Sequence, residues 1–423
     1  MSKGRSVKQN PIKRFFSLLG PGLITGASDN DPSGIATYSI AGAQLGTGLL
    51  WTAFITWPLM AFIQLMCARI GMVTGRGLAG ALRQRCPRWL LLIAVTALLV
   101  SNTITIGADL AGMSDAGQML TGISSRVLTI VFAGSVALAM MYCTYDQIAF
   151  VLKRLTLALF AYVITAFIAK PTWGRVLYDT FIPSLPQGHD GWRNLVAVLG
   201  TTISPYLFFW QASQEIEEQK AKGRRTLASR EGATKREIRD RQIDVGVGTF
   251  FSNLVMYFII LTTALTLHAH NQTDINSSRQ VAEALKPLAG SFAAGLYTIG
   301  VVGVGLLVIP ILAGSSAYAI TETFALKEGL DRRVTSARYF YGVIGASTLL
   351  GVAVVFAKIS PIKALFWASV VNGVLSPFLL IGILIISCDR KLMQRQPSPW
   401  LSRVAVGLTA AIMLAAAGAM FIL

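Results

Sequence analysis

Charged residues are scarce in this 423-residue chain, in which Asp, Glu, Lys and Arg together make up 13% of the sequence. Soluble domains carry about 25% charged residues, so a soluble globular protein is excluded. Hydrophobic residues account for 53% of the chain, and they form many runs long enough to cross a bilayer as a helix. The composition therefore predicts an all-α, polytopic membrane protein that is surrounded by the lipid bilayer.

Cysteine and histidine are also rare, with four and three residues. The cysteines are scattered without C-x-x-C spacing, which predicts packed, reduced thiols and neither disulfides nor a metal site. His189, His268 and His270 are the only histidines, and we expect no zinc site from them. The sequence has no H-E-x-x-H motif and no nucleophile–base pair. We therefore predict no catalytic residues, no enzymatic activity and no bound cofactor.

The net charge of +17 is distributed unevenly along the chain. Eleven membrane spans are predicted, at 16–44, 48–68, 90–113, 127–142, 155–169, 195–214, 246–267, 289–315, 339–357, 363–387 and 402–422. Most Lys and Arg residues fall in alternate loops, which the positive-inside rule makes cytoplasmic. The other loops hold only eight of the 37: Arg126, Lys170, Arg175, Arg193, Arg279, Lys286, Lys358 and Lys363. The surplus charge orients the chain and meets anionic lipid, so no nucleic-acid partner is implied.

This charge pattern predicts a cytoplasmic N-terminal tail at 1–15 and a C-terminus outside, in a bacterial inner membrane. The tail is too long and basic for the start of a signal peptide, so we expect no cleaved leader. The loop 215–244 alternates charges at near-helical spacing, which is typical of a solvated, partly helical connector. The sequence leaves the oligomeric state open.

Two of the predicted spans are interrupted by polar residues and proline. The first contains DNDPSG, with Pro32, and the sixth contains GTTISPY, with Pro205. A proline frees backbone carbonyls of the preceding turn, and a membrane tolerates such breaks only where they are packed in protein or line a cavity. Broken first helices in two successive five-helix segments indicate an inverted-repeat transporter with its site at the midplane. We predict repeats at 16–169 and 195–387 and an eleventh helix at 402–423.

The residue types at the breaks predict a site for a hard cation. Asp31 places a carboxylate in the membrane, where a charge costs at least about 2.5–3.5 kcal/mol. Freed carbonyls, including that of Thr201, and the hydroxyls of Thr202 and Ser204 add only oxygen donors. Oxygen donors suit Mg²⁺, Ca²⁺, Mn²⁺ or Na⁺, and no Cys, Met or His lies in either break to select a softer metal.

These two motifs resemble those of the Nramp family of divalent-metal transporters, which have the LeuT fold. The family pattern G-P-G, eight residues, D-P-G-N-F-A-T is similar to Gly20-Pro21-Gly22, eight residues, Asp31-Pro32-Ser33-Gly34-Ile35-Ala36-Thr37. The family pattern A-T-V-M-P-H-N-x-Y is similar to Thr201-Thr202-Ile203-Ser204-Pro205-Tyr206-Leu207-Phe208-Phe209. The resemblance implies a LeuT-type inverted repeat of five plus five helices, with metal ligands at Asp31 and the carbonyl of Thr201.

The departures from the family pattern concern the metal ligands. The family's asparagine ligand falls on Gly34 and its methionine ligand on Ser204. Without the thioether the site loses a soft ligand that favours Mn²⁺ or Fe²⁺. In this respect the sequence is more similar to the Nramp-related magnesium transporters, which also lack the methionine. Mg²⁺ is often held by one or two carboxylates with its waters retained, which agrees with such a site.

The proton route of the family is altered as well. Its two histidines in the sixth helix fall on Tyr206 and Gln211, and its glutamate in the third helix falls on Asn102, two turns before Asp109. Histidine is the side chain suited to proton transfer near neutral pH, so we expect weak or no proton coupling. Asp109 could relay a proton, or it could pair with a buried group.

Further polar residues extend the predicted site. Asn30 could coordinate the metal or cap the unwound segment, and Asp29 could bind the metal directly or through water. Ser369 falls on a family glutamine and is predicted to line the permeation path, whereas Asn372 is expected to form helix–helix hydrogen bonds.

The sequence thus predicts a transporter that moves Mg²⁺, with Mn²⁺ as a second cargo, by alternating access. One alternative is a proton-coupled importer of Mn²⁺ or Fe²⁺. A more distant alternative keeps the fold but binds Na⁺ at the breaks and an organic substrate nearby.

Overall fold

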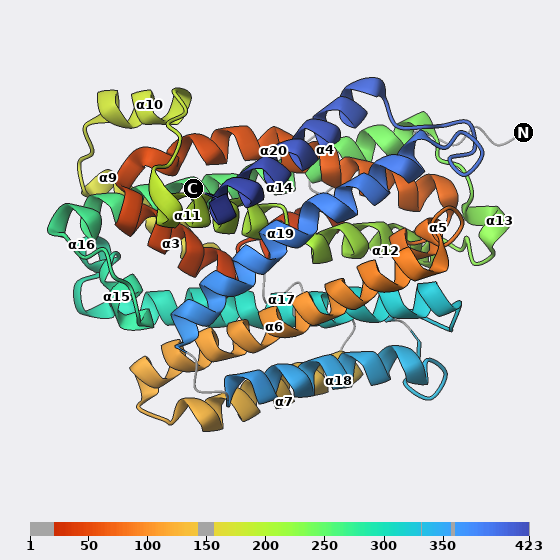
Figure 1. Ribbon diagram of the computed structural model, residues 1–423. Helices are drawn as coiled ribbons and strands as arrows, with labels where there is room; N and C mark the ends of the chain where they lie inside the picture. The colour runs from red at the N-terminus through yellow and green to blue at the C-terminus, as the bar shows by residue number, and fades with distance from the viewer. Residues whose placement is uncertain (1–20, 143–155, 331, 357–359, 423) are drawn as a thin grey trace, which may run out of the picture.

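The computed structural model describes residues 21–142, 156–330, 332–356 and 360–422, and every regular element in these ranges is a helix (Figure 1). The 1–15 tail and the start of the first predicted span lie outside the described residues. In chain order the elements are α2 (Pro21–Ser28), α3 (Pro32–Leu45), η1 (Gly46–Leu49), α4 (Leu50–Thr74), α5 (Leu78–Leu82), α6 (Arg88–Thr121), α7 (Ser125–Tyr142), η2 (Thr156–Leu159), α9 (Phe160–Ile168), α10 (Trp173–Phe181), α11 (Gly188–Thr202), α12 (Pro205–Ala221), α13 (Leu227–Arg230), α14 (Lys235–Thr266), η3 (His268–His270), α15 (Ser278–Glu283), α16 (Lys286–Ala289), η4 (Gly290–Phe292), α17 (Ala293–Phe324), α18 (Arg338–Val355), α19 (Pro361–Cys388) and α20 (Trp400–Ile422).

Nine helical segments within the described residues are long and apolar enough to cross a membrane. One of them, Pro32–Thr74, joins α3 to α4 and so contains part of the first predicted span and all of the second. The predicted span 155–169 falls on η2 and α9, and its first residue lies outside the described part of the chain. The remaining predicted spans each fall on one of these segments.

Several helices extend beyond the predicted spans into the polar ends of the molecule. The predicted loop 215–244 is mostly helical, since α12 continues to Ala221 and α14 begins at Lys235. A capping box starts α14: the Thr234 hydroxyl accepts from the Glu237 amide, and the Glu237 carboxylate accepts from the Thr234 amide. The helices extend beyond the apolar runs from which the spans are predicted, because water can solvate the charged residues at the helix ends.

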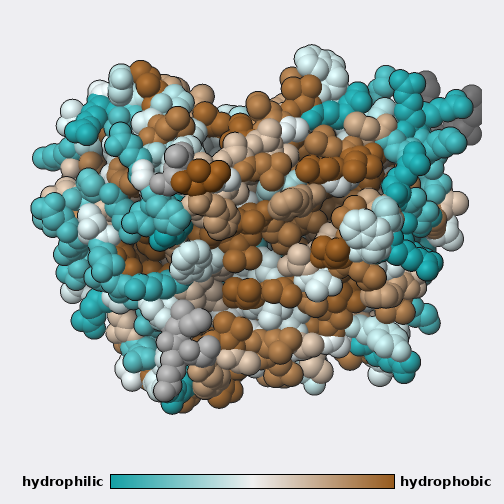
Figure 2. Space-filling model, in the orientation of Figure 1, coloured by the Kyte–Doolittle hydropathy of each residue, from teal (hydrophilic) through white to brown (hydrophobic). Residues whose placement is uncertain are grey.

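The helices lie roughly side by side in one bundle with a polar region at each end. Loops rich in Lys and Arg, at 75–87, 222–234 and 389–399, form the basic end, on the right in Figure 1 near α5 and α13. The opposite end carries α9, α10, α15 and α16. Figure 2 shows a broad hydrophobic band between two hydrophilic ends.

The hydrophobic band consists of outward-facing apolar side chains. Leu349 is 72% exposed, and Ile130 and Phe378 are each 60% exposed. Exposed apolar area on this scale is stable only against lipid. Inside the bundle α3 packs against α11, α14, α19 and α6, and α11 also packs against α19. These inner helices bury the polar residues of the two proline motifs. The chain is therefore a multi-pass membrane protein.

Candidate functional site

Two interrupted helices meet inside the bundle. The first interruption is Asp29–Asp31, between α2 and α3, and the second is Ile203–Ser204, between α11 and α12. Pro32 and Pro205 each occupy the first turn of the following helix, a position where the missing N–H removes no helical hydrogen bond. The structure thus places both breaks where the two proline motifs predict them.

Asp31 connects the two breaks. It is the N-cap of α3, and its Oδ1 accepts a hydrogen bond from the Gly34 amide at 2.5 Å. It also accepts from the side chain of Thr201 in α11, although only 2% of Asp31 is exposed. A buried carboxylate that receives two neutral donors keeps its negative charge uncompensated, which is the condition for attracting a cation.

Gly34 faces a cluster of oxygen atoms. A Cβ atom at this position would lie 3.2 Å from Asp31 Oδ1, 3.2 Å from Thr201 Oγ1 and 3.3 Å from the Asp29 carbonyl oxygen. A side chain at position 34 would therefore project among these three oxygens. Because glycine has none, the protein supplies one donor fewer on this side of the cluster.

Ser252 of α14 holds Asp29 and Asn30. Its hydroxyl donates to Asp29 Oδ2 at 2.5 Å, and Asn30 Nδ2 lies 3.3 Å from both its carbonyl oxygen and its Oγ. Asp29 Oδ1 and Asn30 Oδ1 are buried and have no hydrogen-bond partner among the described residues. Two orphaned acceptors beside a carboxylate are what a bound cation or its waters would satisfy. Sequence reasoning missed Ser252, although a Ser-Asn pair inside an apolar helix is a signal for it.

Ser204 caps the end of α11 in this structure. Its hydroxyl donates to the Thr201 carbonyl at 2.6 Å and lies 3.0 Å from the Gly200 carbonyl. The Thr202 hydroxyl is 3.0 Å from the Tyr38 hydroxyl and so points toward α3. Ser204 and the Thr201 carbonyl are therefore adjacent oxygens, and both keep lone pairs that can still coordinate.

Tyr206 and Gln211 both bond to α2. The Tyr206 hydroxyl donates to the Ser28 carbonyl at 3.1 Å, at the last residue of α2. Gln211 accepts from the Thr25 hydroxyl and donates to Glu215, each at 2.8 Å. The positions at which the family pattern has histidines thus serve here to connect α12 with α2.

Asp109 and Asn102 of α6 have different surroundings. Asp109 Oδ1 accepts from the Ser33 hydroxyl at 2.8 Å, next to the first break, and its Oδ2 has no partner in the part of the chain that the structure describes. Asn102 instead donates to α17, at the Leu312 carbonyl and the hydroxyls of the two serines 315 and 316. Asp109 therefore belongs to the surroundings of the site, whereas the amide of Asn102 ties α6 to α17. Ser33, the link to Asp109, was not among the predicted site residues.

Ser369 and Asn372 lie on α19. The Ser369 hydroxyl accepts a hydrogen bond from the Thr37 hydroxyl at 2.9 Å. Thr37 lies in α3, about one helical turn after Gly34. Asn372 Oδ1 accepts from Ser101 of α6 at 2.5 Å. Ser369 thus touches the helix that carries the site, and Asn372 makes the helix–helix hydrogen bond expected of it.

The donor set limits the metals that fit. No group of three or more His, Cys, Asp and Glu side chains in the described residues is arranged to hold a metal ion. A cation between the breaks would therefore be held by Asp31, supported by Asp29, together with neutral oxygens. This donor set is typical of hard cations that keep part of their water shell.

Comparison with known proteins gives the family of this chain. Residues 22–423 match the Nramp family, described as natural resistance-associated macrophage protein-like. The divalent metal cation transporter MntH of Caldanaerobacter subterraneus subsp. tengcongensis is 25% identical over 410 residues, which cover 95% of this chain and 92% of the relative. MntH of Pectobacterium carotovorum subsp. carotovorum is 28% identical over 411 residues, which cover 94% and 92%.

Solved structures show the same fold. A manganese transporter of Eremococcus coleocola superposes with a TM-score of 0.76 at 16% identity, covering all of this chain and 90% of that one. The inward-facing structure of Mhp1 gives a TM-score of 0.54 at 14% identity, covering 95% and 90%. The all-α, LeuT-type fold predicted from the sequence is confirmed.

The family match over residues 22–423, together with the broken helices inside the bundle, makes this chain a multi-pass membrane transporter and not an enzyme. The chain belongs to the Nramp family, as the two proline motifs predicted.

Proposed function

We propose that this Nramp-family transporter moves divalent metal cations by alternating access and that its preferred cargo is Mg²⁺, carried with part of its water shell. The observation that carries the proposal is the oxygen cluster around Gly34, where Asp31, Thr201 and the Asp29 carbonyl surround a position without a side chain. Mg²⁺ gives up water reluctantly and binds through one or two carboxylates, so a site with few protein donors suits it.

Ser204 supports the same cargo. A hydroxyl replaces the thioether expected from the family pattern, and a soft thioether is the donor that would favour Mn²⁺ or Fe²⁺ over hard ions. An oxygen-only site therefore loses discrimination against Mg²⁺, and it accepts Mn²⁺ as a second cargo through the same ligands.

A proton-coupled Mn²⁺ transporter is the second candidate. The matched relatives are named divalent metal cation transporters, and the structural neighbour of Eremococcus coleocola is a manganese transporter. Asp109, with one unpartnered oxygen beside the first break, is the group that would carry the proton. Against this candidate, the two histidine positions hold Tyr206 and Gln211, which bond to α2.

The orientation and the repeats are part of the proposal. We assign the basic end to the cytoplasm, because Lys and Arg collect there, in a bacterial inner membrane. The repeats at 16–169 and 195–387 are supported by the position of each break in the first helix of its segment, and α20 is the eleventh helix.

The test is a flux assay in proteoliposomes that contain the purified protein and dyes for Mg²⁺, Mn²⁺ and pH. We expect Mg²⁺ influx without acidification, and inhibition of Mn²⁺ influx by excess Mg²⁺. If Mn²⁺ enters with protons while Mg²⁺ neither enters nor competes, the second candidate is correct and the magnesium proposal is wrong.

A further inference from the structure

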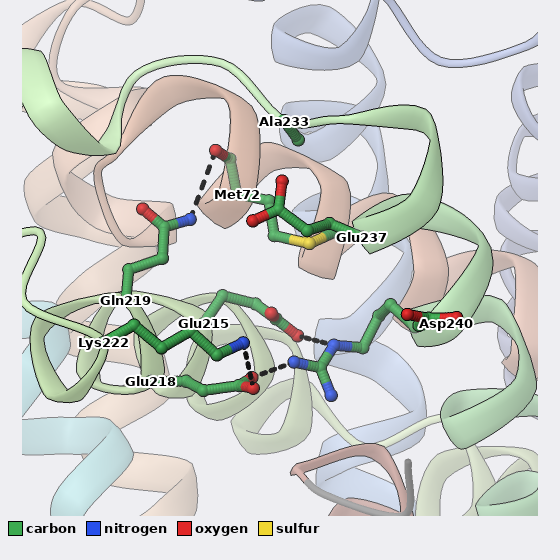
Figure 3. Close-up of a pocket in the computed structure, with 9 residues that line it drawn as sticks. Met72, Glu215, Glu218, Gln219, Lys222, Ala233, Glu237 and Asp240 are labelled. Atoms are coloured by element: carbon green, nitrogen blue, oxygen red, sulfur yellow. Dashed lines mark hydrogen bonds and ion pairs between the residues drawn. The ribbon is translucent and has the colours of Figure 1, made fainter. Parts of the chain in front are cut away.

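A cavity of about 240 Å³ lies at the basic end of the bundle (Figure 3). Arg241 is one of the residues that line it. Four carboxylates line this cavity, together with Arg241 and Lys222: Glu215, Glu218, Glu237 and Asp240. Arg241 itself is only 7% exposed. A nearly buried guanidinium requires several anionic partners to offset its desolvation, and the structure provides them from two helices.

The guanidinium pairs with three carboxylates. Its Nε lies 2.6 Å from Glu215 Oε1 and its Nη1 lies 2.6 Å from Asp244 Oδ2, while Nη2 donates to Glu218. Glu215 and Glu218 belong to α12, and Asp244 lies one turn along α14. Because guanidinium presents its donors in a rigid fork, Arg241 fixes the distance and angle between these two helices.

Two of the same carboxylates also hold α2. Asp244 Oδ2 accepts from the Gly22 amide at 2.8 Å. Glu215 accepts from Gln211, and Gln211 accepts in turn from Thr25 of α2, each at 2.8 Å. The half-helix that leads into the Asp29–Asp31 break is therefore tied at two points to carboxylates that Arg241 neutralises.

The packing of α2 on α14 is very close. A Cβ atom at Gly22 would lie 2.7 Å from the Val245 amide nitrogen, and one at Gly26 would overlap the backbone of Gly248. The two backbones are thus in direct contact. The polar links to Asp244 and Gln211 add to this packing, together with the hydrogen bond from Tyr206 to the Ser28 carbonyl.

We propose that Arg241 is the closing element of a gate between the metal site and the basic end. With its three carboxylates paired, it holds α2 against α12 and α14 and closes the site on that side. Breaking these pairs releases α2 and opens the site to the cavity. The inference rests on the proposed function for the ion that passes, but the gate itself is defined by these contacts alone.

The gate can be tested by cysteine labelling without any metal. In a background with all four native cysteines replaced by alanine, Ser28→Cys places a reporter thiol at the end of α2, where Ser28 is fully buried. A hydrophilic thiol reagent is added to inside-out vesicles, and the labelling rate is measured for Arg241→Gln. A second variant combines Arg241→Gln, Glu215→Gln and Asp244→Asn, so that no buried charge is left unpaired and the fold is retained.

We expect both variants to label about tenfold faster than the parent, because a released α2 populates the open state more. The control is Arg236→Gln on the same helix, because the Arg236 side chain is 79% exposed and lies 3.8 Å from Asp240. Its labelling rate should equal that of the parent. An unchanged rate in the folded triple variant, or faster labelling only from the opposite face, overturns the gate. Neither result depends on which cation is transported, so a failure of the magnesium proposal would appear only in the flux assay.

Discussion

At the scale of single residues, the site is defined as much by small side chains as by its carboxylates. Gly34 faces Asp31 and Thr201, and the Ser204 hydroxyl donates a hydrogen bond to the Thr201 carbonyl. Both positions could be compared with the family pattern from the sequence. The hydrogen-bond partner of Asp29 could not be predicted from the sequence, because Ser252 is more than two hundred residues away along the chain and only the fold brings the two together.

Restoring the two family ligands should change the selectivity. We expect Gly34→Asn with Ser204→Met to raise the preference for Mn²⁺ over Mg²⁺ by about tenfold, or about 1.4 kcal/mol, because an amide oxygen and a soft thioether join the site. Competition of each ion against Mn²⁺ influx measures the ratio. Ser135→Ala on the exposed face of α7 serves as a control that leaves the ratio unchanged. A double variant with unaltered selectivity would show that these positions do not face the ion.

We expect Ser252→Ala to destabilise the protein more in the absence of Mg²⁺ than in its presence. The substitution leaves Asp29 Oδ2 buried without its donor, which costs about 1–3 kcal/mol in unfolding free energy. Saturating Mg²⁺ should recover part of this loss, because the cation or its waters can satisfy the freed oxygen. Thermal unfolding with and without Mg²⁺ measures both effects.

Ser135→Ala is again the matched control, since Ser135 is exposed and its hydroxyl donates to the Val131 carbonyl of its own helix. If saturating Mg²⁺ raises the melting temperature of Ser252→Ala no more than that of this control, no cation binds near Asp29.

At the scale of elements, the broken helices could be predicted from the sequence and their mutual geometry could not. Proline after a polar residue in an apolar run located both breaks, and the structure begins α3 at Pro32 and α12 at Pro205. The ends of the long helices were misplaced. The apolar runs mark the membrane, whereas α6, α14 and α17 continue through charged residues into the polar ends.

Close contact between α2 and α14 gives a prediction at this scale. Gly26→Ala places a methyl group on the backbone of Gly248, so we expect α2 to be displaced and the protein to lose about 1–3 kcal/mol of stability. Gly134→Ala on α7 is the control, because no atom of the described residues lies within 4 Å of its Cβ position. It should be neutral or stabilise by about 0.5–1 kcal/mol. Equal melting temperatures for the two variants would contradict the contact.

At the scale of the whole molecule, the basic end carries a pH-dependent group. Partial burial, together with the nearby Glu217, raises the pKa of Glu328 to about 7, against the lowering effects of Lys220, Arg230 and a hydrogen bond from Thr321. A carboxyl whose pKa is raised on folding favours the unfolded state once that state ionises. Its destabilising effect is absent below the ordinary glutamate pKa, grows as the pH rises toward 7 and is constant above.

The melting temperature should therefore fall between pH 5 and pH 7.5, and it should fall less in Glu328→Gln, which cannot ionise. The two proteins are compared in the same detergent across this range. Parallel pH profiles would show that Glu328 is not the group responsible.

The proposed transport of metal ions depends on Asp31, the carboxylate that connects the two breaks. The direct measurement is Mg²⁺ influx into proteoliposomes for the wild type and for Asp31→Ala. Asp190→Ala is the control, because the Asp190 side chain is 81% exposed and pairs with its helix neighbour Arg193. We predict that Asp31→Ala reduces influx to the level of protein-free liposomes, while Asp190→Ala retains wild-type influx. Wild-type influx in a folded Asp31→Ala protein would contradict the central claim.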